Sequence, residues 1–307
     1  MIQNKRILIT GGTGSLGREL ARRLHTDNHI VVYSRNEERQ YLMKQEFPKD
    51  HMSFFIGDVR DTETLEYALH GCDIAIHGAA MKDLIMCEDQ PTQTILNNIE
   101  GSRSFIQAVR RTPTVKRACA VSTDKAASPS NVYGCSKYIM EQLFREANRT
   151  SPCIFFSVRF GNMIDSTGSL ISYWKQHPNT DIKLTHPEVA RFFFRLKDGA
   201  DTVTKAIEIA EGGEILIRKM KQARIHDILR IITGREKFEI IGLFPGEKIH
   251  EELMSANEAA YGFDIGDYYV IRPGVINPAP LSVLSTETAP PFTENELREL
   301  LDVPLAG

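Results

Sequence analysis

The feature that most constrains the fold is a glycine-rich loop directly after the first apolar segment. Residues Arg6–Thr10 read as a short buried strand, and the sequence GGTGSLG follows, with Gly11, Gly14 and Gly17 spaced GxxGxxG. A strand that turns through such a loop into a helix brings free backbone N–H groups up to an anion. An incidental glycine-rich turn is the alternative, but the strand before and the helix after are the context that a dinucleotide site requires.

Short apolar segments alternate with amphipathic stretches through the first half of the chain. The apolar segments predict strands at Arg6–Thr10, His29–Ser34, Met52–Ile56, Asp73–His77, Arg117–Ser122 and Ile154–Arg159. The amphipathic stretches predict helices at Ser15–His25, Thr62–His70, Thr92–Val109 and Val132–Ala147. Strands that are apolar throughout and separated by helices indicate an α/β fold with a doubly wound parallel sheet, the NAD(P)-binding Rossmann fold.

The regular alternation fades after about residue 160, which predicts a second, smaller unit. We expect helices at Ser169–His177, Leu196–Glu211, Ile225–Thr233 and Glu294–Leu301, a strand at Glu214–Ile217 and an extended surface crossing at Pro273–Pro291. Thr293 and Glu296 would cap the last helix. We assign residues 1–165, completed by parts of 190–225, to the dinucleotide-binding domain, and residues 166–189 and 226–307 to a substrate-binding lobe and C-terminal tail.

Composition excludes several classes of protein. The net charge of the 307 residues is −3, which gives no reason to expect a nucleic-acid surface or a polybasic membrane patch. No apolar segment approaches the roughly 18 residues of a membrane helix, and the immediate N-terminal strand leaves no room for a signal peptide. The five cysteines form no CxxC pair, so we expect reduced, buried thiols in a cytoplasmic protein, without disulfides or a metal site.

The ends of the second, third and fourth strands predict how the dinucleotide is held. An NAD site usually has an acidic residue after the second strand, whereas this chain has Ser34 and Arg35. A hydroxyl and a guanidinium suit a 2′-phosphate, so NADP is favoured, with NAD as the alternative if Arg35 is only a solvated charge. Asp58 would hold the adenine amine, and the small residues Ala79 and Ala80 would let the cofactor lie against the backbone.

Five groups that can move or hold protons lie within fifteen residues of the sequence. They are Thr123, Asp124, Lys125, Tyr133 and Lys137. Tyr133 and Lys137 are four residues apart and share a helix face, where an ammonium is expected to lower the pKa of the phenol. Such a phenol can take a proton from a sugar hydroxyl while hydride leaves the same carbon.

These motifs resemble the extended short-chain dehydrogenase/reductases. The combination of STDKA at Ser122–Ala126 with NVYGCSK at Asn131–Lys137 is similar to the inverting UDP-N-acetylglucosamine 4,6-dehydratases of glycan biosynthesis. Further matches run along residues 5 to 273 and include TGGTGSLG, SRNE, GDVRD, HGAAMK, RFGN, ARFFF and PGEKIHEELM. Plain epimerases of this group usually lack the Asp-Lys pair.

The resemblance implies a reaction and a role for each residue. Tyr133 would deprotonate the C4 hydroxyl as it is oxidised, Lys125 would remove the C5 proton, Asp124 would protonate the departing C6 hydroxyl, and Thr123 would orient the C4 oxygen. Lys125 then needs a depressed pKa. The implied cofactor contacts are Gly11, Thr13, Gly14, Ser15, Leu16, Gly17, Ser34, Arg35, Asp58, Val59, Ala79, Ala80, Lys82, Asn98, Tyr133 and Lys137, and the implied substrate contacts are Lys82, Asn162, Arg191 and Glu247.

Several residues keep two interpretations. Asp124 and Lys125 could form only an ion pair that caps a strand, Lys82 could be a solvated charge, and His77 and Arg159 could be structural. His226, His250 and Glu251 have no convincing metal-ligand spacing.

The substrate-contact positions depart from the family pattern more than the catalytic ones. Phe244 and Thr167 stand where the family usually has arginine. We therefore expect a nucleotide-sugar 4,6-dehydratase. The sequence specifies its reaction type better than it specifies which nucleotide sugar the protein binds. A 4-epimerase or 4-keto reductase is the main alternative, and a non-catalytic NADP-binding module is a remote one. The resemblance also implies a homo-oligomer, a dimer or higher, paired through the helices at Thr92–Val109 and Val132–Ala147.

Overall fold

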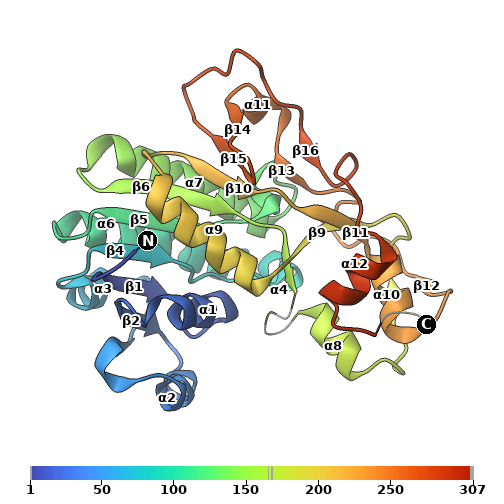
Figure 1. Ribbon diagram of the computed structural model, residues 1–307, viewed down its shortest axis with the longest axis horizontal. Coiled ribbons are helices and arrows are strands. Elements are labelled where there is room, and N and C mark those ends of the chain that lie inside the picture. Colours follow the sequence, from blue (N-terminus) through green and yellow to red (C-terminus); the bar gives the residue numbers. More distant parts are fainter. Residues whose placement is uncertain (1, 165, 167–168, 305–307) are drawn as a thin grey trace.

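The computed structural model describes residues 2–164, 166 and 169–304, and a mostly parallel sheet forms its centre (Figure 1). Nine strands of the described residues form it, in the order β14 (Gly262–Asp264), β15 (Tyr268–Ile271), β10 (Ile215–Arg218), β6 (Ile154–Arg159), β5 (Arg117–Val121), β4 (Ile74–His77), β1 (Arg6–Thr10), β2 (His29–Ser34) and β3 (Met52–Ile56). Neighbours from β10 to β3 run parallel, whereas β15 is antiparallel to both β10 and β14.

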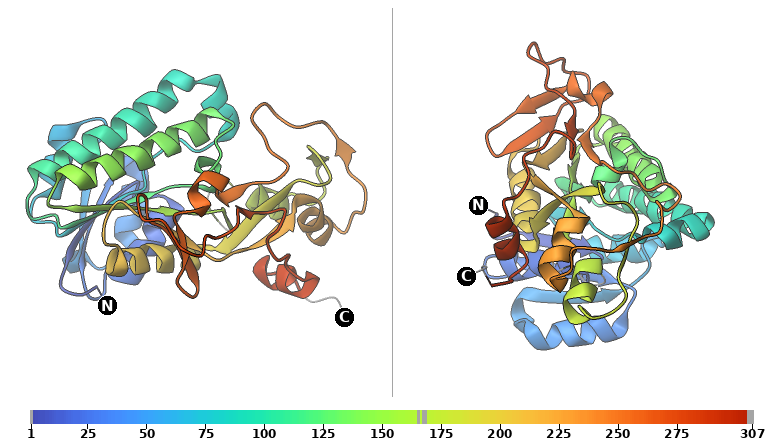
Figure 2. Two further views of the ribbon diagram at one scale, coloured as in Figure 1. Left: turned by 90° about the horizontal axis from the view of Figure 1, so that it is seen from above. Right: turned by 90° about the vertical axis from the view of Figure 1, so that its right-hand side faces the viewer.

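Helices cover both faces of this sheet, as the two views of Figure 2 show. One face packs against α1 (Ser15–Leu24), α2 (Glu37–Glu46) and α9 (Leu196–Ile209), and the other against α3 (Thr62–Leu69), α6 (Gly101–Arg111) and α7 (Val132–Thr150). Because both faces are covered, successive strand residues such as Leu8 and Ile9 are both fully buried, in different cores. The predicted doubly wound sheet is confirmed.

The strand order places a crevice beside β1. The chain runs from β1 outward to β2 and β3, then returns to place β4 on the other side of β1. Loops that follow β1 and β4 therefore diverge at the carboxyl edge of the sheet, which is where open α/β sheets bind ligands. Gly11 and Ala79 meet at this point.

A smaller lobe lies at one end of the molecule, on the right of Figure 1. Its sheet consists of β7 (Asn162–Ile164), β9 (Ala190–Arg195) and β11 (Lys221–Arg224), with a second pair formed by β8 (Lys183–Leu184) and β12 (Glu239–Ile240). The helices α8 (Leu170–Gln176), α10 (Ile225–Thr233) and α12 (Glu294–Leu300) pack on a shared apolar core with this sheet. Thr293 and Glu296 form the expected capping box of α12.

The C-terminal third returns to the main sheet before it ends in the lobe. Strands β14 and β15 lie within the range 226–307 that the sequence analysis gives to the lobe, yet they extend the main sheet. Strand β13 (Glu252–Met254) pairs with β16 (Leu284–Ser285), and α11 (Ala256–Ala259) lies between β13 and β14. The crossing expected at Pro273–Pro291 is therefore extended but includes one short paired strand.

Two helical regions differ from the expectation. The helix expected at Thr92–Val109 consists of α5 (Pro91–Thr94), a π-helix η2 (Ile95–Glu100) and α6, after a short α4 (Leu84–Asp89). Helix α2 was not predicted, because only Gln40 and Met43 of its ten residues are buried and no apolar stripe marks it. The prediction of buried thiols is wrong for Cys135, which is exposed on α7.

Candidate active site

A cavity of about 1180 Å³ lies between the carboxyl edge of the main sheet and the lobe. It is lined by nearly all of the residues that the sequence singled out, from the glycine loop, the strand ends and the lobe alike. The exceptions are Asp58, Asn98 and Asp124, whose side chains do not form its lining. Thr167 lies outside the described residues.

The glycine loop has the geometry of an anion cradle. Gly11 has φ +67°, and a Cβ atom there would lie 2.9 Å from the backbone nitrogen of Ala79. A Cβ atom on Gly17 would lie 2.6 Å from the Cα atom of Gly12, so only glycine allows the loop to close on α1. Gly14, the N-cap residue of α1, places no side chain over the helix N-terminus. These features fit a pyrophosphate bound at that N-terminus.

The end of β2 presents a cation rather than a carboxylate. The side chain of Arg35 is 62% exposed at the cavity, with Nη1 3.2 Å from Oδ1 of Asn97. Ser34 Oγ accepts a hydrogen bond from Nε2 of Gln40 at 3.0 Å. Asp58 pairs with Arg60 at 2.7 Å, and this hydrogen bond holds the pKa of the carboxyl below its usual range. Arg35 and Arg39 both line the cavity after β2, and Nη1 of Arg35 also lies 3.8 Å from Oδ2 of Asp58.

The side chain of Asn98 connects parts of the protein to one another in this structure. Its amide bridges the backbone of Met81 in both directions, at 2.8 and 2.9 Å, and donates to Ser136 Oγ at 2.9 Å. The π-helix thus ties the loop after β4 to α7, which carries the tyrosine and the lysine of the site.

The Thr-Asp-Lys segment forms a 3-10 turn, η3 (Asp124–Ala126), directly beyond β5. Thr123 Oγ1 donates to Oδ1 of Asp124 at 2.9 Å, and Nζ of Lys125 donates to the same oxygen at 3.0 Å. Asp124 is completely buried behind Lys125, which faces the cavity. Asp124 and Lys125 therefore do form an ion pair. This geometry is compatible both with a catalytic acid–base pair and with a structural ion pair that caps the strand.

Tyr133 and Lys137 lie one turn apart on α7 and both line the cavity. The expected fall in the pKa of the phenol is contradicted: burial raises the pKa of Tyr133 to about 12, and the opposing effects of Lys125 and of hydrogen bonding to Thr123 are smaller. Nζ of Lys137 instead contacts Sδ of Met140 at 3.3 Å. Burial lowers the pKa of Lys137 itself to about 8.

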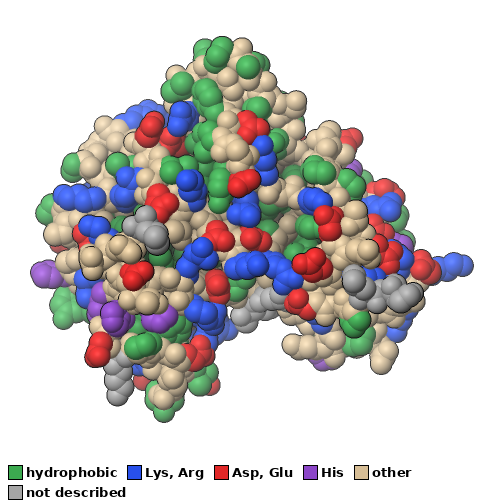
Figure 3. Space-filling view, in the orientation of Figure 1, with side chains coloured by type: hydrophobic (Ala, Val, Ile, Leu, Met, Phe, Trp, Pro, Cys, Tyr) green, Lys and Arg blue, Asp and Glu red, His purple; other side chains and the backbone are tan. Residues whose placement is uncertain are grey.

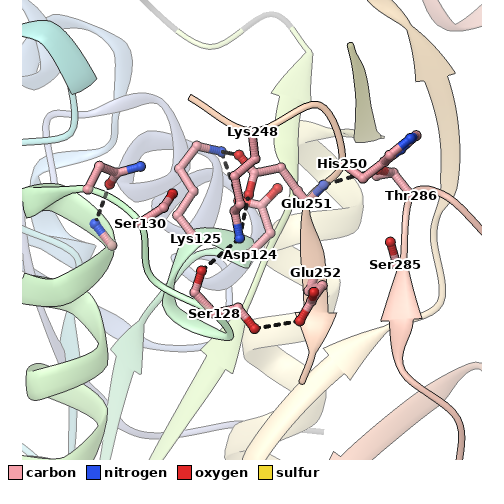
Figure 4. A network of polar contacts seen from close by, with 12 residues as sticks. Asp124, Lys125, Ser128, Ser130, Lys248, His250, Glu251, Glu252, Ser285 and Thr286 are labelled. Carbon is pink, nitrogen blue, oxygen red and sulfur yellow. Dashed lines mark hydrogen bonds and ion pairs between the residues drawn. The ribbon is translucent and has the colours of Figure 1, made fainter. Parts of the chain in front are cut away.

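The expectation of a depressed pKa for Lys125 is also wrong in this structure. Burial lowers the pKa of its amine, but the carboxylates of Asp124 and Glu251 together outweigh burial and raise it above its ordinary value. Lys125 therefore rests as an ammonium ion between two carboxylates, as Figure 4 shows.

Sequence reasoning missed the part that Glu251 and Lys248 play in this cluster. Oε1 of Glu251 lies 3.3 Å from Nζ of Lys125, and Oε2 lies 3.5 Å from Nζ of Lys248. Lys248 also donates to the carbonyl of Ser128 at 2.7 Å, which joins the C-terminal segment to the loop before α7. The signal in the sequence was the alternation of acidic and basic residues in EKIHEE, where Glu251 itself was weighed only as a metal ligand.

The predicted substrate contacts gather on the lobe side of the cavity. Arg191 pairs with Glu247 at 3.2 Å, and Glu247 accepts hydrogen bonds from Oγ1 of Thr185 at 3.1 Å and from the backbone N–H of Phe244 at 3.2 Å. Phe244 is 45% exposed in the lining. Asn162 and Lys82 also line the cavity, and Lys82 is exposed.

Two residues with open interpretations are structural. His77 is buried between Thr10 Oγ1 and Ser102 Oγ, each at 3.0 Å. Arg159 is fully buried and forms paired hydrogen bonds with Glu141 and Glu258. Neither side chain lines the cavity.

Comparison with known proteins settles the family. Residues 7–273 match the family model described as polysaccharide biosynthesis protein. The chain belongs to this family. It is 36% identical over 284 residues to a UDP-N-acetylglucosamine 4,6-dehydratase (inverting) of Campylobacter jejuni. The aligned region covers 90% of this chain and 85% of the relative.

Other members of the polysaccharide biosynthesis protein family have different names. A UDP-glucose 4-epimerase of Rickettsia bellii is 34% identical over 286 residues, which cover 88% of this chain and 84% of the relative. Among solved structures, Pen from Bacillus thuringiensis superposes with a TM-score of 0.91 at 32% identity, over 97% of this chain and 98% of that one. The family therefore includes both dehydratases and epimerases that act on nucleotide sugars.

Three observations concern the charge distribution, the helices and the metal-ligating side chains of the described residues. Acidic and basic side chains lie interspersed across the face shown in Figure 3. None of the described helices has both the length and the apolar character needed to cross a membrane. Nor does any group of three or more His, Cys, Asp or Glu side chains within these residues have an arrangement that could hold a metal ion.

Proposed function

We propose that this protein is a nucleotide-sugar 4,6-dehydratase that converts UDP-N-acetylglucosamine to the 4-keto-6-deoxy sugar with inversion at C5. The observation that carries the proposal is the hydrogen-bonded pair of Asp124 and Lys125, whose Oδ1 and Nζ lie 3.0 Å apart, together with Tyr133 nearby. Removal of water across C5 and C6 requires both an acid and a base, whereas an epimerase only moves a hydride out and back. The identity with the Campylobacter jejuni dehydratase supports the same choice.

The cofactor site fits a nicotinamide dinucleotide. The glycine loop and the N-terminus of α1 would hold its pyrophosphate, and Arg35 would hold a 2′-phosphate. When bound, such a cofactor accepts a hydride from C4 and returns it at C6. Tyr133, which lines the same cavity, would take the proton of the C4 hydroxyl.

The charged state of Asp124 and Lys125 explains how one pair supplies both an acid and a base. Movement of one proton from Nζ to Oδ1 along the 3.0 Å contact converts the ion pair into a neutral amine and a carboxylic acid. The amine then takes the C5 proton, the acid gives its proton to the departing C6 hydroxyl, and the pair returns to its starting charges. Tyr133 has taken one proton from the C4 hydroxyl, and C5 regains one proton at the end, delivered by Tyr133 or Lys125. The reaction therefore neither gains nor loses protons.

Arg35 provides the test of the proposed preference for NADP. Arg35→Gln is expected to weaken NADP binding by about 10-fold or more, because it removes a charge-assisted contact, and to change NAD binding much less. Calorimetry on cofactor-free protein measures both affinities, and Arg22→Gln on the exposed side of α1 is the control. Equal losses for the two dinucleotides would contradict a 2′-phosphate contact.

The first test of the reaction is proton NMR of the protein incubated with UDP-N-acetylglucosamine in D₂O. A new C6 methyl signal with deuterium at C5 is the expected result, and its couplings report whether C5 has inverted. A changed C4 configuration without a methyl signal would instead establish an epimerase, the activity after which the Rickettsia bellii relative is named. Stoichiometric consumption of NADPH would indicate a 4-keto reductase.

An unchanged substrate would direct attention to the nucleotide. Phe244 lines the cavity at a position where a ring cannot form two hydrogen bonds to a phosphate, so other UDP-, dTDP- and GDP-sugars would follow. Binding of NADP without turnover of any of them would favour a non-catalytic binding module.

A further inference from the structure

We propose that Glu251 is a positioning residue of the active site, because its carboxylate holds the ammonium group of Lys125 against Asp124. The inference rests on the proposed dehydratase function and adds to it a residue that no motif of the glycine loop or of the Tyr-Lys pair includes. It makes the C-terminal segment part of the acid–base apparatus.

The backbone of Glu251 is fixed from both sides. Its N–H donates to Oγ1 of Thr286 at 3.0 Å, and its carbonyl accepts from the N–H of Thr286 at 2.9 Å. The residue is only 2% exposed, directly before β13. A carboxylate that is buried and anchored in this way has a small choice of positions, and the one it takes points toward Lys125 (Figure 4).

The charges around this carboxylate are dominated by cations. Lys125 Nζ lies 3.3 Å and Arg191 Nε 3.9 Å from Oε1, while Lys248 Nζ lies 3.5 Å from Oε2. Oε2 is buried and accepts no hydrogen bond from the residues that the structure describes. Burial of a carboxylate is costly without such partners, and the three nearby cations offset that cost.

Lys125 has carboxylates on two sides and further charges around them. Asp124 lies 3.0 Å from Nζ within the same turn, Arg191 reaches the cluster from β9, and Tyr133 faces Lys125 from α7. Removal of the charge of Glu251 leaves Asp124 as the one carboxylate paired with Nζ among the described residues. Lys125 would then lose its proton at lower pH, because an opposite charge at this distance favours the ammonium form.

The test compares three variants by the pH dependence of kcat and KM. Glu251→Gln keeps the shape of the side chain and removes the charge, Glu251→Asp keeps the charge, and Glu252→Gln changes the adjacent carboxylate, which hydrogen-bonds Ser128 rather than Lys125. Glu251→Gln is expected to move the descending limb of kcat to lower pH by about 1 unit, because loss of the Lys125 proton removes the proton that the departing C6 hydroxyl needs, and to change KM less than kcat. Glu251→Asp and Glu252→Gln are expected to keep the limb close to that of the wild type.

Coincident limbs for Glu251→Gln and the wild type would overturn the proposal, as would an equal shift in Glu252→Gln. A loss of rate without a shift would show that Glu251 acts only as packing. Thermal unfolding of each variant identifies any that fail to fold.

A second measurement does not depend on turnover. Cyanate is small enough to enter the cavity that Lys125 lines and carbamylates only neutral amines, so the pH dependence of labelling, read by peptide mass spectrometry, reports when Lys125 loses its proton. In the wild type the midpoint is expected above that of exposed lysines, and in Glu251→Gln about 1 unit lower. Shifted labelling without turnover of any sugar would overturn the dehydratase proposal but not the Glu251–Lys125 contact. Turnover with unshifted labelling would overturn the role of Glu251 alone.

Discussion

At the scale of single residues, the site is organised by the sharing of protons between buried groups. Asp124 is fully buried and accepts hydrogen bonds from both Thr123 and Lys125 on one oxygen, Oδ1. Its other oxygen, Oδ2, is buried without a hydrogen-bond partner among the described residues. A buried oxygen without a partner is costly, so the stability of this carboxylate depends on the two hydrogen bonds that Oδ1 accepts.

Substitution of Lys125 separates the two halves of the proposed reaction. Lys125→Ala is expected to bind the cofactor and to oxidise C4, because Tyr133 remains, but to lower dehydration by about 100-fold or more, the range of general acid–base effects. The absorbance of the reduced nicotinamide would then accumulate when substrate is added. Full formation of the C6 methyl product by this variant would contradict the assignment of the base.

Lys137 gives a prediction about stability and pH. Burial holds its pKa at about 8 in the folded protein, against 10.5 for an ordinary lysine. The unfolded chain therefore binds more protons between these values, and the contribution of Lys137 to stability becomes more favourable as pH rises through that window. Lys137→Met is expected to raise the melting temperature of the cofactor-free protein at pH 7, with an advantage that shrinks toward pH 10. An advantage that stays constant with pH would contradict a buried, titrating amine.

At the scale of secondary-structure elements, a buried ionic network connects β6, α7 and α11. Arg159 on β6 forms paired hydrogen bonds to Glu141 on α7 and to Glu258 on α11. Because Arg159 and Glu141 are both almost completely buried, loss of one partner leaves an uncompensated charge in the interior.

Arg159→Met is therefore expected to lower the free energy of unfolding by about 3–5 kcal/mol. Denaturant unfolding measures the change. Lys219→Met serves as the comparison, because its ion pair with Asp264 is exposed to solvent and its loss should matter far less. A similar effect of both substitutions would contradict the structural importance of the buried network.

The sequence predicted the elements of the first half well because their signals are local. A continuous apolar stretch, such as Ala118–Val121 of β5, and a glycine loop such as the one after β1 are recognisable without any tertiary partner. The π-helix η2 was not predicted, because its amphipathic spacing resembles that of an α-helix and its geometry depends on the contacts of Asn98 with Met81 and Ser136. Strands β14 and β15 were missed because they are short and depend on distant pairing, β15 with β10 and β14 with β15.

The candidate site shows the same division between local and non-local information. Tyr133 and Lys137 could be placed on one helix face from their spacing, and the structure places them in the cavity. The pKa values of Lys125 and Tyr133 could not be predicted, because they depend on burial and on Glu251, which is 126 positions further along the chain than Lys125. Spacing in the sequence identifies candidates, whereas their protonation depends on distant partners.

At the scale of the whole molecule, one side of the sheet exposes apolar side chains on the helices beside the site. Ile95 is 47% exposed on η2, and Tyr138 and Ile139 are 41% and 39% exposed on α7. These segments coincide with the helices through which the sequence analysis expects two copies of the chain to pair. Ile139→Glu is therefore expected to lower the molecular mass in solution from that of a dimer or higher oligomer toward that of a monomer.

Light scattering after size-exclusion chromatography measures this change. Leu42→Glu is a control for the substitution itself, because Leu42 is 52% exposed on α2, which packs on the other face of the main sheet from α7. A wild-type protein that is monomeric at all concentrations would contradict the expected assembly.

The path of the chain between the main sheet and the lobe has a consequence for how such enzymes diversify. The chain enters the lobe at β7, returns to the sheet through α9 and β10, goes back to the lobe at β11, rejoins the sheet at β14 and β15, and ends in the lobe at α12. No single cut releases the lobe as a continuous segment. A relative with a new sugar preference therefore cannot have acquired it by exchange of an intact module. Substitutions made in place, within a fold that had to remain whole at every step, are the expected route.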